Sequence, residues 1–82
     1  MSARDRRKWD ILAVSAGSIY PMPATNLLRQ AGLKRTPYGM ELLSELVQDG
    51  WLKTEQAELN NGLPVKLYSM TEAARQAWDQ IE

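Results

Sequence analysis

Four stretches of the chain repeat apolar residues at the spacing of an α-helix. The first stripe consists of Trp9, Leu12, Ala13 and Ala16, with Ile19 just beyond it. Ser2 can cap this helix, and we expect the helix to end near Gly17. Residues 18–23 contain Pro21 and Pro23, and a residue that precedes a proline is pushed out of the helical region. This segment is therefore predicted to be extended.

Two further helices follow, joined by a short turn. The second should have Pro23 in its first turn and stop at Gly32, which suits a left-handed C-terminal position. Its inner face holds Leu27, Leu28 and Ala31. The third should begin at Thr36, a hydroxyl cap followed by Pro37, and end at Gly50. Its apolar face consists of Gly39, Leu42, Leu43, Leu46 and Val47. Two helices joined by such a turn form a helix-turn-helix arrangement.

After the third helix, the apolar period changes from that of a helix towards that of a strand. Residues 51–59 and 63–70 are predicted strands, and the Asn-Asn-Gly of residues 60–62 is a hairpin turn signal. Pro64 begins the returning strand, where a missing N–H does least harm. Thr71 can then cap a last helix. Its apolar stripe consists of Ala74, Ala77, Trp78 and Ile81.

The composition allows one small domain and little catalytic chemistry. With 82 residues, 44% of them hydrophobic, the chain has room for a single core, so we predict one domain over residues 1–82. The chain has no Cys and no His, which removes thiol nucleophiles, disulfides, the usual metal ligands and the commonest general base. We therefore expect no enzyme activity, no cofactor and no metal. The sequence contains no usual signal peptide and no membrane span, so we expect a cytoplasmic protein without a membrane partner.

The charge is balanced overall and uneven along the chain. Ten basic and ten acidic residues give a formal net charge of +0. Up to Met40, seven basic residues face two acidic ones and give +5, whereas from Glu41 onward three basic residues face eight acidic ones and give −5. The zero sum removes the simplest argument for a nucleic-acid partner, but two halves of opposite sign indicate a directional interaction surface.

The order of elements and two sequence strings resemble the winged helix-turn-helix domain of small prokaryotic transcriptional regulators, most closely the PadR-like and MarR-like groups. One string is LLRQAGLKRTPYGMELLSELVQDGWL, in which Leu43, Leu46, Gly50 and Trp51 carry the resemblance; the other is LYSMTEAARQAW at the entry to the last helix. The resemblance covers nearly the whole chain. It implies an α+β fold with three helices, a two-stranded β-hairpin wing and a C-terminal helix. It also implies that the third helix enters the major groove of double-stranded DNA, that the wing touches the adjacent backbone or minor groove, and that a terminal helix builds a homodimer.

The outward face of the third helix is unusual for a DNA reader. Its residues are Pro37, Tyr38, Glu41, Ser44, Glu45 and Gln48, without Lys or Arg. Gln can read adenine, whereas Glu can accept only from cytosine and repels phosphate. Glu41 and Glu45 therefore count against strong DNA binding through this helix, and a solvated pair of like charges is an equally good interpretation. Tyr38 either contacts a sugar or a thymine methyl or covers the turn.

Basic and polar residues around this helix complete the candidate DNA interface. We expect contacts from the turn, the third helix, the wing and the N-terminal segment: Lys34, Arg35, Thr36, Tyr38, Glu41, Ser44, Gln48, Lys53, Asn60, Asn61, Lys66, Arg4, Arg6, Arg7 and Lys8. The turn also lies at a helix N-terminus, whose free amide groups favour phosphate. Each charge by itself is more often an ordinary solvated residue, but the set within a helix-turn-helix frame favours phosphate contact.

A dimer interface could lie on either terminal helix. Its candidates are Trp9, Ala74, Ala77, Trp78 and Ile81, with Trp78 as the aromatic anchor. The alternative is that the last helix packs onto the first helix of the same chain. The sequence does not choose between the two.

Two functions fit these residues. The first is a small sequence-specific DNA-binding transcriptional regulator that reads a short palindrome as a dimer. The second is a winged-helix protein-interaction module without DNA binding, in which the acidic face of Glu41, Glu45 and Asp49 docks a basic partner protein. The salt dependence of DNA binding separates the two.

Overall fold

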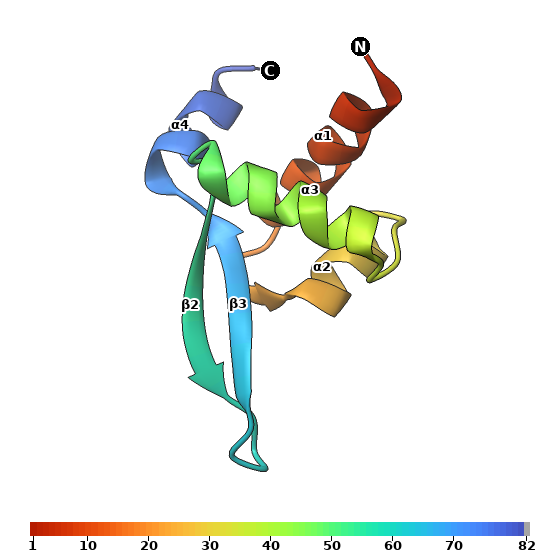
Figure 1. Ribbon diagram of the computed structural model, residues 1–82. Coiled ribbons are helices and arrows are strands. Elements are labelled where there is room, and N and C mark those ends of the chain that lie inside the picture. Colours follow the sequence, from red (N-terminus) through yellow and green to blue (C-terminus); the bar gives the residue numbers. More distant parts are fainter. Residues whose placement is uncertain (82) are drawn as a thin grey trace.

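The computed structural model describes residues 1–81, in which four helices gather at one end of a three-stranded antiparallel sheet (Figure 1). The elements are α1 (Ala3–Ala16), β1 (Met22–Pro23), α2 (Ala24–Gln30), α3 (Pro37–Gln48), β2 (Leu52–Glu58), β3 (Pro64–Met70) and α4 (Glu72–Asp79). The β2–β3 hairpin extends away from the helices as a wing (Figure 1). The predicted α+β winged helix-turn-helix arrangement is confirmed.

The three predicted hydroxyl caps are all present. The backbone N–H groups of Asp5, Gly39 and Ala74 each donate, over 3.1 Å, to the side-chain oxygens of Ser2, Thr36 and Thr71 respectively. Each cap satisfies one of the amide groups that the first turn of a helix leaves without a partner. At the other ends of α2 and α3, Gly32 and Gly50 adopt φ angles of 80° and 83°, the left-handed conformation expected of them.

The buried stripe of α1 differs from the predicted one. Ile11 and Leu12 are buried together with Ser15, which is only 5% exposed, whereas the predicted Ala13 is exposed. A serine can occupy this position because its hydroxyl donates to the carbonyl oxygen of Ile11 over 3.0 Å and so has its own partner inside the helix. Because Ser15 is polar, the sequence does not show that it belongs to the buried stripe. That stripe lies one position before the predicted alanines.

The sheet has one more strand than predicted. The extended segment before α2 forms β1, which pairs with β3 so that Met22 lies opposite Tyr68 and Pro23 opposite Leu67. The strand order is therefore β1-β3-β2 instead of a two-stranded hairpin. Pro23 lies at the cap position just before α2, not in its first turn, because an extended backbone there can align with the free edge of β3.

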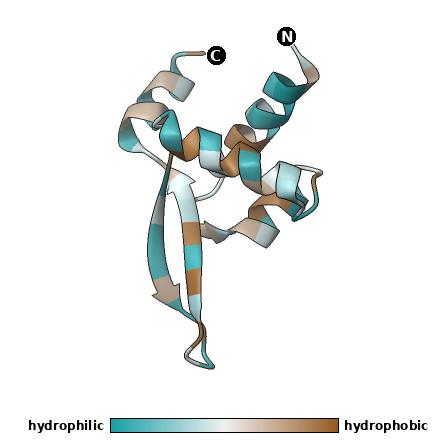
Figure 2. Ribbon diagram, viewed as in Figure 1, coloured by the Kyte–Doolittle hydropathy of each residue, from teal (hydrophilic) through white to brown (hydrophobic). Residues whose placement is uncertain are grey.

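The register of the hairpin fixes which wing residues share a face. Gln56 lies opposite Lys66, and Lys53 lies opposite Ser69. Because side chains alternate between the two faces of a sheet, Lys66 shares its face with the buried Tyr68, whereas Lys53 lies on the other face. The alternation of hydrophobic and hydrophilic residues is visible along β3 (Figure 2).

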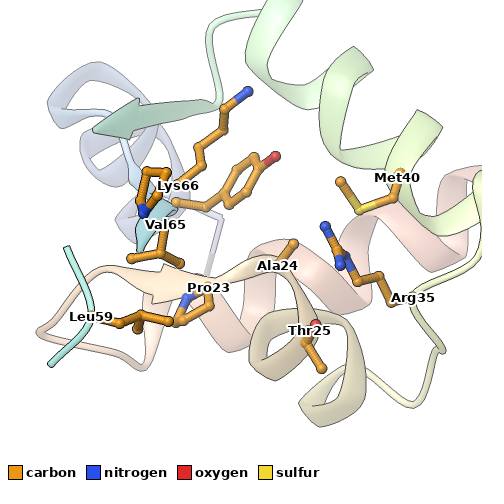
Figure 3. A pocket seen from close by; sticks show the side chains of 10 residues that line it. Pro23, Ala24, Thr25, Arg35, Met40, Leu59, Val65 and Lys66 are labelled. Carbon is orange, nitrogen blue, oxygen red and sulfur yellow. The ribbon is translucent and has the colours of Figure 1, made fainter. Parts of the chain in front are cut away.

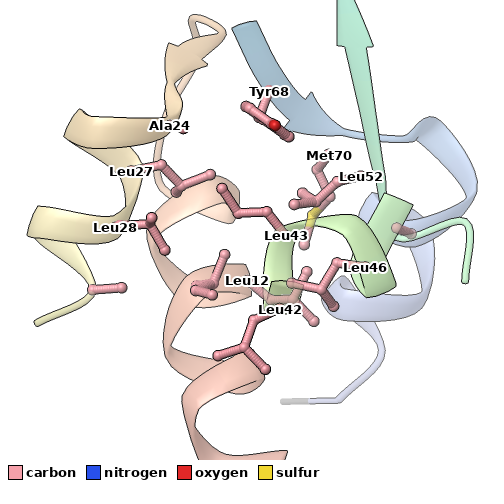
Figure 4. Packing of buried hydrophobic residues seen from close by; sticks show 13 residues of the cluster. Leu12, Ala24, Leu27, Leu28, Leu42, Leu43, Leu46, Leu52, Tyr68 and Met70 are labelled. Atoms are coloured by element: carbon pink, nitrogen blue, oxygen red, sulfur yellow. The ribbon is translucent and has the colours of Figure 1, made fainter. Parts of the chain in front are cut away.

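The core lies where α1, α2 and α3 meet the base of the sheet (Figure 4). Its fully buried side chains are those of Ile11, Leu27, Leu28, Leu42, Leu43 and Leu52. The turn before α3 approaches this core very closely: a methyl group added at Gly39 would lie 2.7 Å from the backbone oxygen of Lys34 and 3.2 Å from Leu28 Cδ1. Glycine therefore lets α3 pack directly against the turn and α2, which fixes the direction of the helix.

Candidate nucleic-acid interface

The exposed face of α3 is flanked by two different parts of the molecule. Figure 1 shows α3 lying across the domain with α1 on one side and the hairpin on the other. Its outermost positions are Pro37, Glu41, Ser44 and Gln48, all of them exposed as predicted. At about 100° per residue, Tyr38 and Glu45 lie towards one flank and Met40 towards the other. The two flanks have different chemistry.

Towards α1, the acidic residues of α3 are neutralised. Glu45 pairs with Arg4 through Oε2 and with Lys8 through Oε1, the latter over 3.2 Å, and Arg4 also lies 3.5 Å from Glu41 Oε1. The Arg4 guanidinium lies 5.7 Å from the centre of the Tyr38 ring, within the range of a cation–π contact. The cluster of Arg4, Lys8, Glu41 and Glu45 is therefore neutral.

This cluster bears on the interpretation of Glu41 and Glu45 as a solvated pair of like charges: Glu41 is solvated, with its side chain 62% exposed, whereas Glu45 is not. Glu45 is half-buried against α1, with its side chain 32% exposed, and each of its carboxylate oxygens has a cationic partner. The sequence does not reveal this arrangement because Arg4 and Lys8 lie 41 and 37 residues away from Glu45. Only the packing of α1 on α3 brings them together.

Towards the wing, a groove of about 340 Å³ lies between the hairpin and the junction of β1 with α2, and Met40 of α3 also borders it (Figure 3). Arg35 and Met40 line one side and Lys66 and Val65 the other, so that both cations border the same hollow (Figure 3). Tyr68 also lines the groove. A concave surface with two cations beside an exposed helix suits a phosphodiester backbone.

The surroundings of Tyr68 move the titration of its hydroxyl further from neutral pH. Burial raises the pKa of this phenol above its ordinary value of 10.0, and the positive charge of Arg35 offsets part of the rise. At neutral pH the side chain is therefore an uncharged group that can donate a hydrogen bond into the groove. Neither Tyr68 nor Met40 is among the site residues predicted from the sequence. For Tyr68 a signal existed, because it shares a strand face with Lys66 two residues away.

The remaining DNA candidates are spread over several surfaces. Lys34, Thr36, Arg6, Arg7, Asn60 and Asn61 are exposed. The Thr36 hydroxyl oxygen is used as the cap of α3, and Asn61 Oδ1 accepts the backbone N–H of Leu63 over 3.1 Å, which shapes the wing tip. The structure does not place Lys53 beside Lys66, because the hairpin register puts them on opposite faces.

The candidate residues for a dimer interface differ in whether they are packed within one chain or exposed. The rings of Trp9 and Trp78 lie 5.1 Å apart within one chain, and Ala74 is buried in the core. For these three residues the structure shows the alternative in which α4 packs onto its own α1. Ala77 and Ile81 are exposed.

Arg75 ties the two terminal helices together, a role that the sequence did not suggest. Its guanidinium donates to the carbonyl oxygens of Ala16 and Ser18 over 3.2 and 3.4 Å. Cations are favoured at this end of a helix, where carbonyl groups lack partners inside the helix.

No group of three or more acidic side chains within residues 1–81 is arranged to hold a metal ion. In the same part of the chain, every helix is too short or too polar to span a membrane.

A helix-turn-helix followed by a β-hairpin beside its third helix defines a winged helix-turn-helix domain. A PadR-like transcription factor from Bacteroides fragilis has a similar structure: it is 20% identical, with a TM-score of 0.65 over 94% of this chain and 79% of its own. A protein from Thermoplasma acidophilum described as a transcriptional regulator is 17% identical, with a TM-score of 0.72 over 94% of this chain and 80% of its own. At these identities the likeness establishes the fold, and it confirms the resemblance to PadR-like regulators at that level. No protein-family model matches the sequence, and neither does any curated protein.

Proposed function

We propose that this protein is a sequence-specific DNA-binding transcriptional regulator that inserts α3 into the major groove and places its wing on the adjacent backbone. The observation that carries the proposal is the groove beside the wing, where Arg35 from the turn before α3 and Lys66 from the wing border one concave surface. The structures it resembles are a transcription factor and a protein described as a transcriptional regulator. We also propose that it acts in the cytoplasm and has no catalytic activity.

The exposed positions of α3 are suited to reading bases. Gln48 can form two hydrogen bonds to adenine, Ser44 can pair with several bases, and Glu41 can accept a hydrogen bond from cytosine. The neutralisation of Glu41 and Glu45 by α1 lowers the repulsion that these carboxylates would otherwise exert on phosphate. The main objection raised by the sequence is thereby weakened.

The same neutralisation argues against the alternative of a protein-interaction module with an acidic docking face. Of the three acidic residues proposed for that face, Glu45 is paired twice and Glu41 lies beside Arg4. A basic partner would have to displace Arg4 and Lys8 to reach Glu45. Within residues 1–81, Asp49 is the member of that face outside these ion pairs, and one exposed carboxylate attracts a partner only weakly.

We further propose that the regulator acts as a homodimer. A monomer with a net charge of +0 can release few counterions from DNA, and two copies double the number of phosphate contacts. The exposed Ala77 of α4 and Ile81 just after it, beside the Trp9–Trp78 pair, offer an apolar surface for a second copy. A dimer would read two half-sites related by its own symmetry.

Fluorescence anisotropy with a labelled duplex of mixed sequence, measured at several salt concentrations, tests the proposal. Each phosphate contact contributes about 0.9 to the slope of log affinity against log salt. We expect Arg35→Ala and Lys66→Ala each to lower that slope by about this amount. Lys53→Ala is the matched control, because it removes the same charge from the opposite face of the wing and should leave the slope nearly unchanged. Undetectable binding of the wild-type protein at low salt would refute DNA binding.

A further inference from the structure

Helix α3 carries no arginine or lysine of its own, yet a guanidinium lies on its surface. Residues 37–48 contain only Glu41 and Glu45 as charged residues. The guanidinium comes from Arg4 of α1, which reaches across to Glu45, Glu41 and the ring of Tyr38. Arg4 therefore belongs to the surface of α3 in space, although it belongs to α1 in sequence.

The two cations of this cluster are placed for different tasks. The side chain of Lys8 is only 19% exposed, and its ammonium pairs with one carboxylate oxygen of Glu45. The side chain of Arg4 is 38% exposed, and its guanidinium pairs with the other carboxylate oxygen of Glu45. A guanidinium has five N–H donors in a planar fork, so the bond to Glu45 leaves donors for another acceptor. Lys8 therefore serves mainly to neutralise Glu45, whereas the more exposed Arg4 keeps donors for another acceptor.

We propose that Arg4 contacts a DNA phosphate on the flank of α3 opposite the wing, and that Glu45 is its positioning residue. This inference rests on the proposed function, because it assumes that α3 enters the major groove. The carboxylate of Glu45 and the ring of Tyr38 hold the Arg4 side chain in one place, so that less conformational entropy is lost on binding.

The position of Arg4 favours a phosphate over a base edge. Tyr38 and Glu45 lie about a quarter turn away from the outermost residues of α3, so Arg4 borders the inserted face instead of lying on it. A major groove is bounded by a phosphate backbone on each side. Arg35 and Lys66 lie on one flank of α3, and Arg4 lies on the other, which gives the helix a cationic contact for each strand.

The test compares Arg4→Gln with Arg6→Gln. Both variants remove one positive charge from the first turns of α1, but residues two positions apart lie about 200° apart around a helix. We expect Arg4→Gln to lower the slope of log affinity against log salt by about 0.9 for a mixed-sequence duplex. Between 1 M and 50 mM salt, the affinity of the variant should therefore change by roughly fifteenfold less than that of the wild type. The sequence makes Arg6 a DNA candidate too, but Arg4 faces α3 and Arg6 lies on the other side of α1, so Arg6→Gln should have a much smaller effect. Arg4→Lys, which keeps the charge, should retain most of the slope.

The outcomes separate this inference from the proposed function. If the wild-type protein binds no duplex, the proposed function fails. If it binds and the Arg4→Gln and Arg6→Gln slopes are equal, only the role of Arg4 is refuted. Melting curves of each variant show whether it is folded. If Arg4→Gln does not fold, the test uses Arg4→Lys instead.

Glu45→Gln tests the positioning role directly. A carboxylate that merely repels DNA would, once removed, raise the affinity and leave the effect of Arg4→Gln unchanged. A carboxylate that positions Arg4 makes the two substitutions depend on each other. We therefore expect Arg4→Gln to change the slope less than half as much in the Glu45→Gln background as in the wild type. An undiminished effect would refute the positioning role.

Discussion

Replacing Gly39 with alanine should destabilise the domain, although alanine is the better helix former. In an ordinary helix interior this change would stabilise the protein by up to about 1 kcal/mol. Here the added methyl group would lie 2.7 Å from the backbone oxygen of Lys34 and 3.2 Å from Leu28 Cδ1. The oxygen cannot easily move away, because it accepts the backbone N–H of Thr36 over 2.8 Å.

Forcing an extra methyl group into a packed site typically costs about 1–3 kcal/mol, and a fixed backbone oxygen places this site in the upper part of that range. After the helix-propensity gain is subtracted, we expect a net loss of about 1–2 kcal/mol in the free energy of unfolding. For a domain of this size, each kcal/mol corresponds to roughly 4–8 °C in Tm.

Thermal and urea unfolding followed by circular dichroism measure this effect. Ser44→Ala is the matched control, because Ser44 is exposed on the same helix and the change should stabilise slightly through helix propensity alone. A Gly39→Ala variant that melts at or above the wild-type temperature would show that the turn can relax, and would refute the view that close packing requires glycine here.

Two further predictions concern the aromatic residues. Because Trp9 and Trp78 stack within one chain, a double-mutant cycle of Trp9→Ala and Trp78→Ala should give a coupling free energy of about 0.5–1.5 kcal/mol in urea unfolding; additive effects would contradict the contact. Sedimentation of Trp78→Ala addresses the proposed dimer: a lower mass than wild type would place this residue in the interface as well. Burial raises the pKa of Tyr68, so the folded state holds this proton more tightly than the unfolded state, and stability should fall as pH rises above 10.0. The difference in unfolding free energy between wild type and Tyr68→Phe should be constant below that pH and should change above it in favour of Phe; a difference independent of pH up to strongly alkaline conditions would contradict the prediction.

The sequence by itself determined where most elements begin and end. The caps at Ser2, Thr36 and Thr71 and the left-handed glycines at Gly32 and Gly50 were all predicted correctly. These signals are local, because a cap or a left-handed turn depends on groups three or four residues apart.

The sequence was less informative where a buried polar residue or an unpaired edge was involved. The stripe of α1 was misread because Ser15 is buried and makes its own hydrogen bond inside the helix. Strand β1 was missed because a segment of two residues is too short to show the alternation of a strand. It becomes a strand only by pairing with the free edge of β3.

Tertiary structure decided the chemistry of the candidate site. The sequence indicated an acidic α3 and a basic N-terminal segment, and only the packing of α1 on α3 joined Arg4 and Lys8 to Glu45. Part of the charge balance behind the net charge of +0 thus comes from ion pairs between distant residues, so the two halves of the chain do not form two separate charged surfaces. Ion pairs of this kind depend on which helix faces meet, and that choice is made by the burial of the core, to which charged residues contribute little.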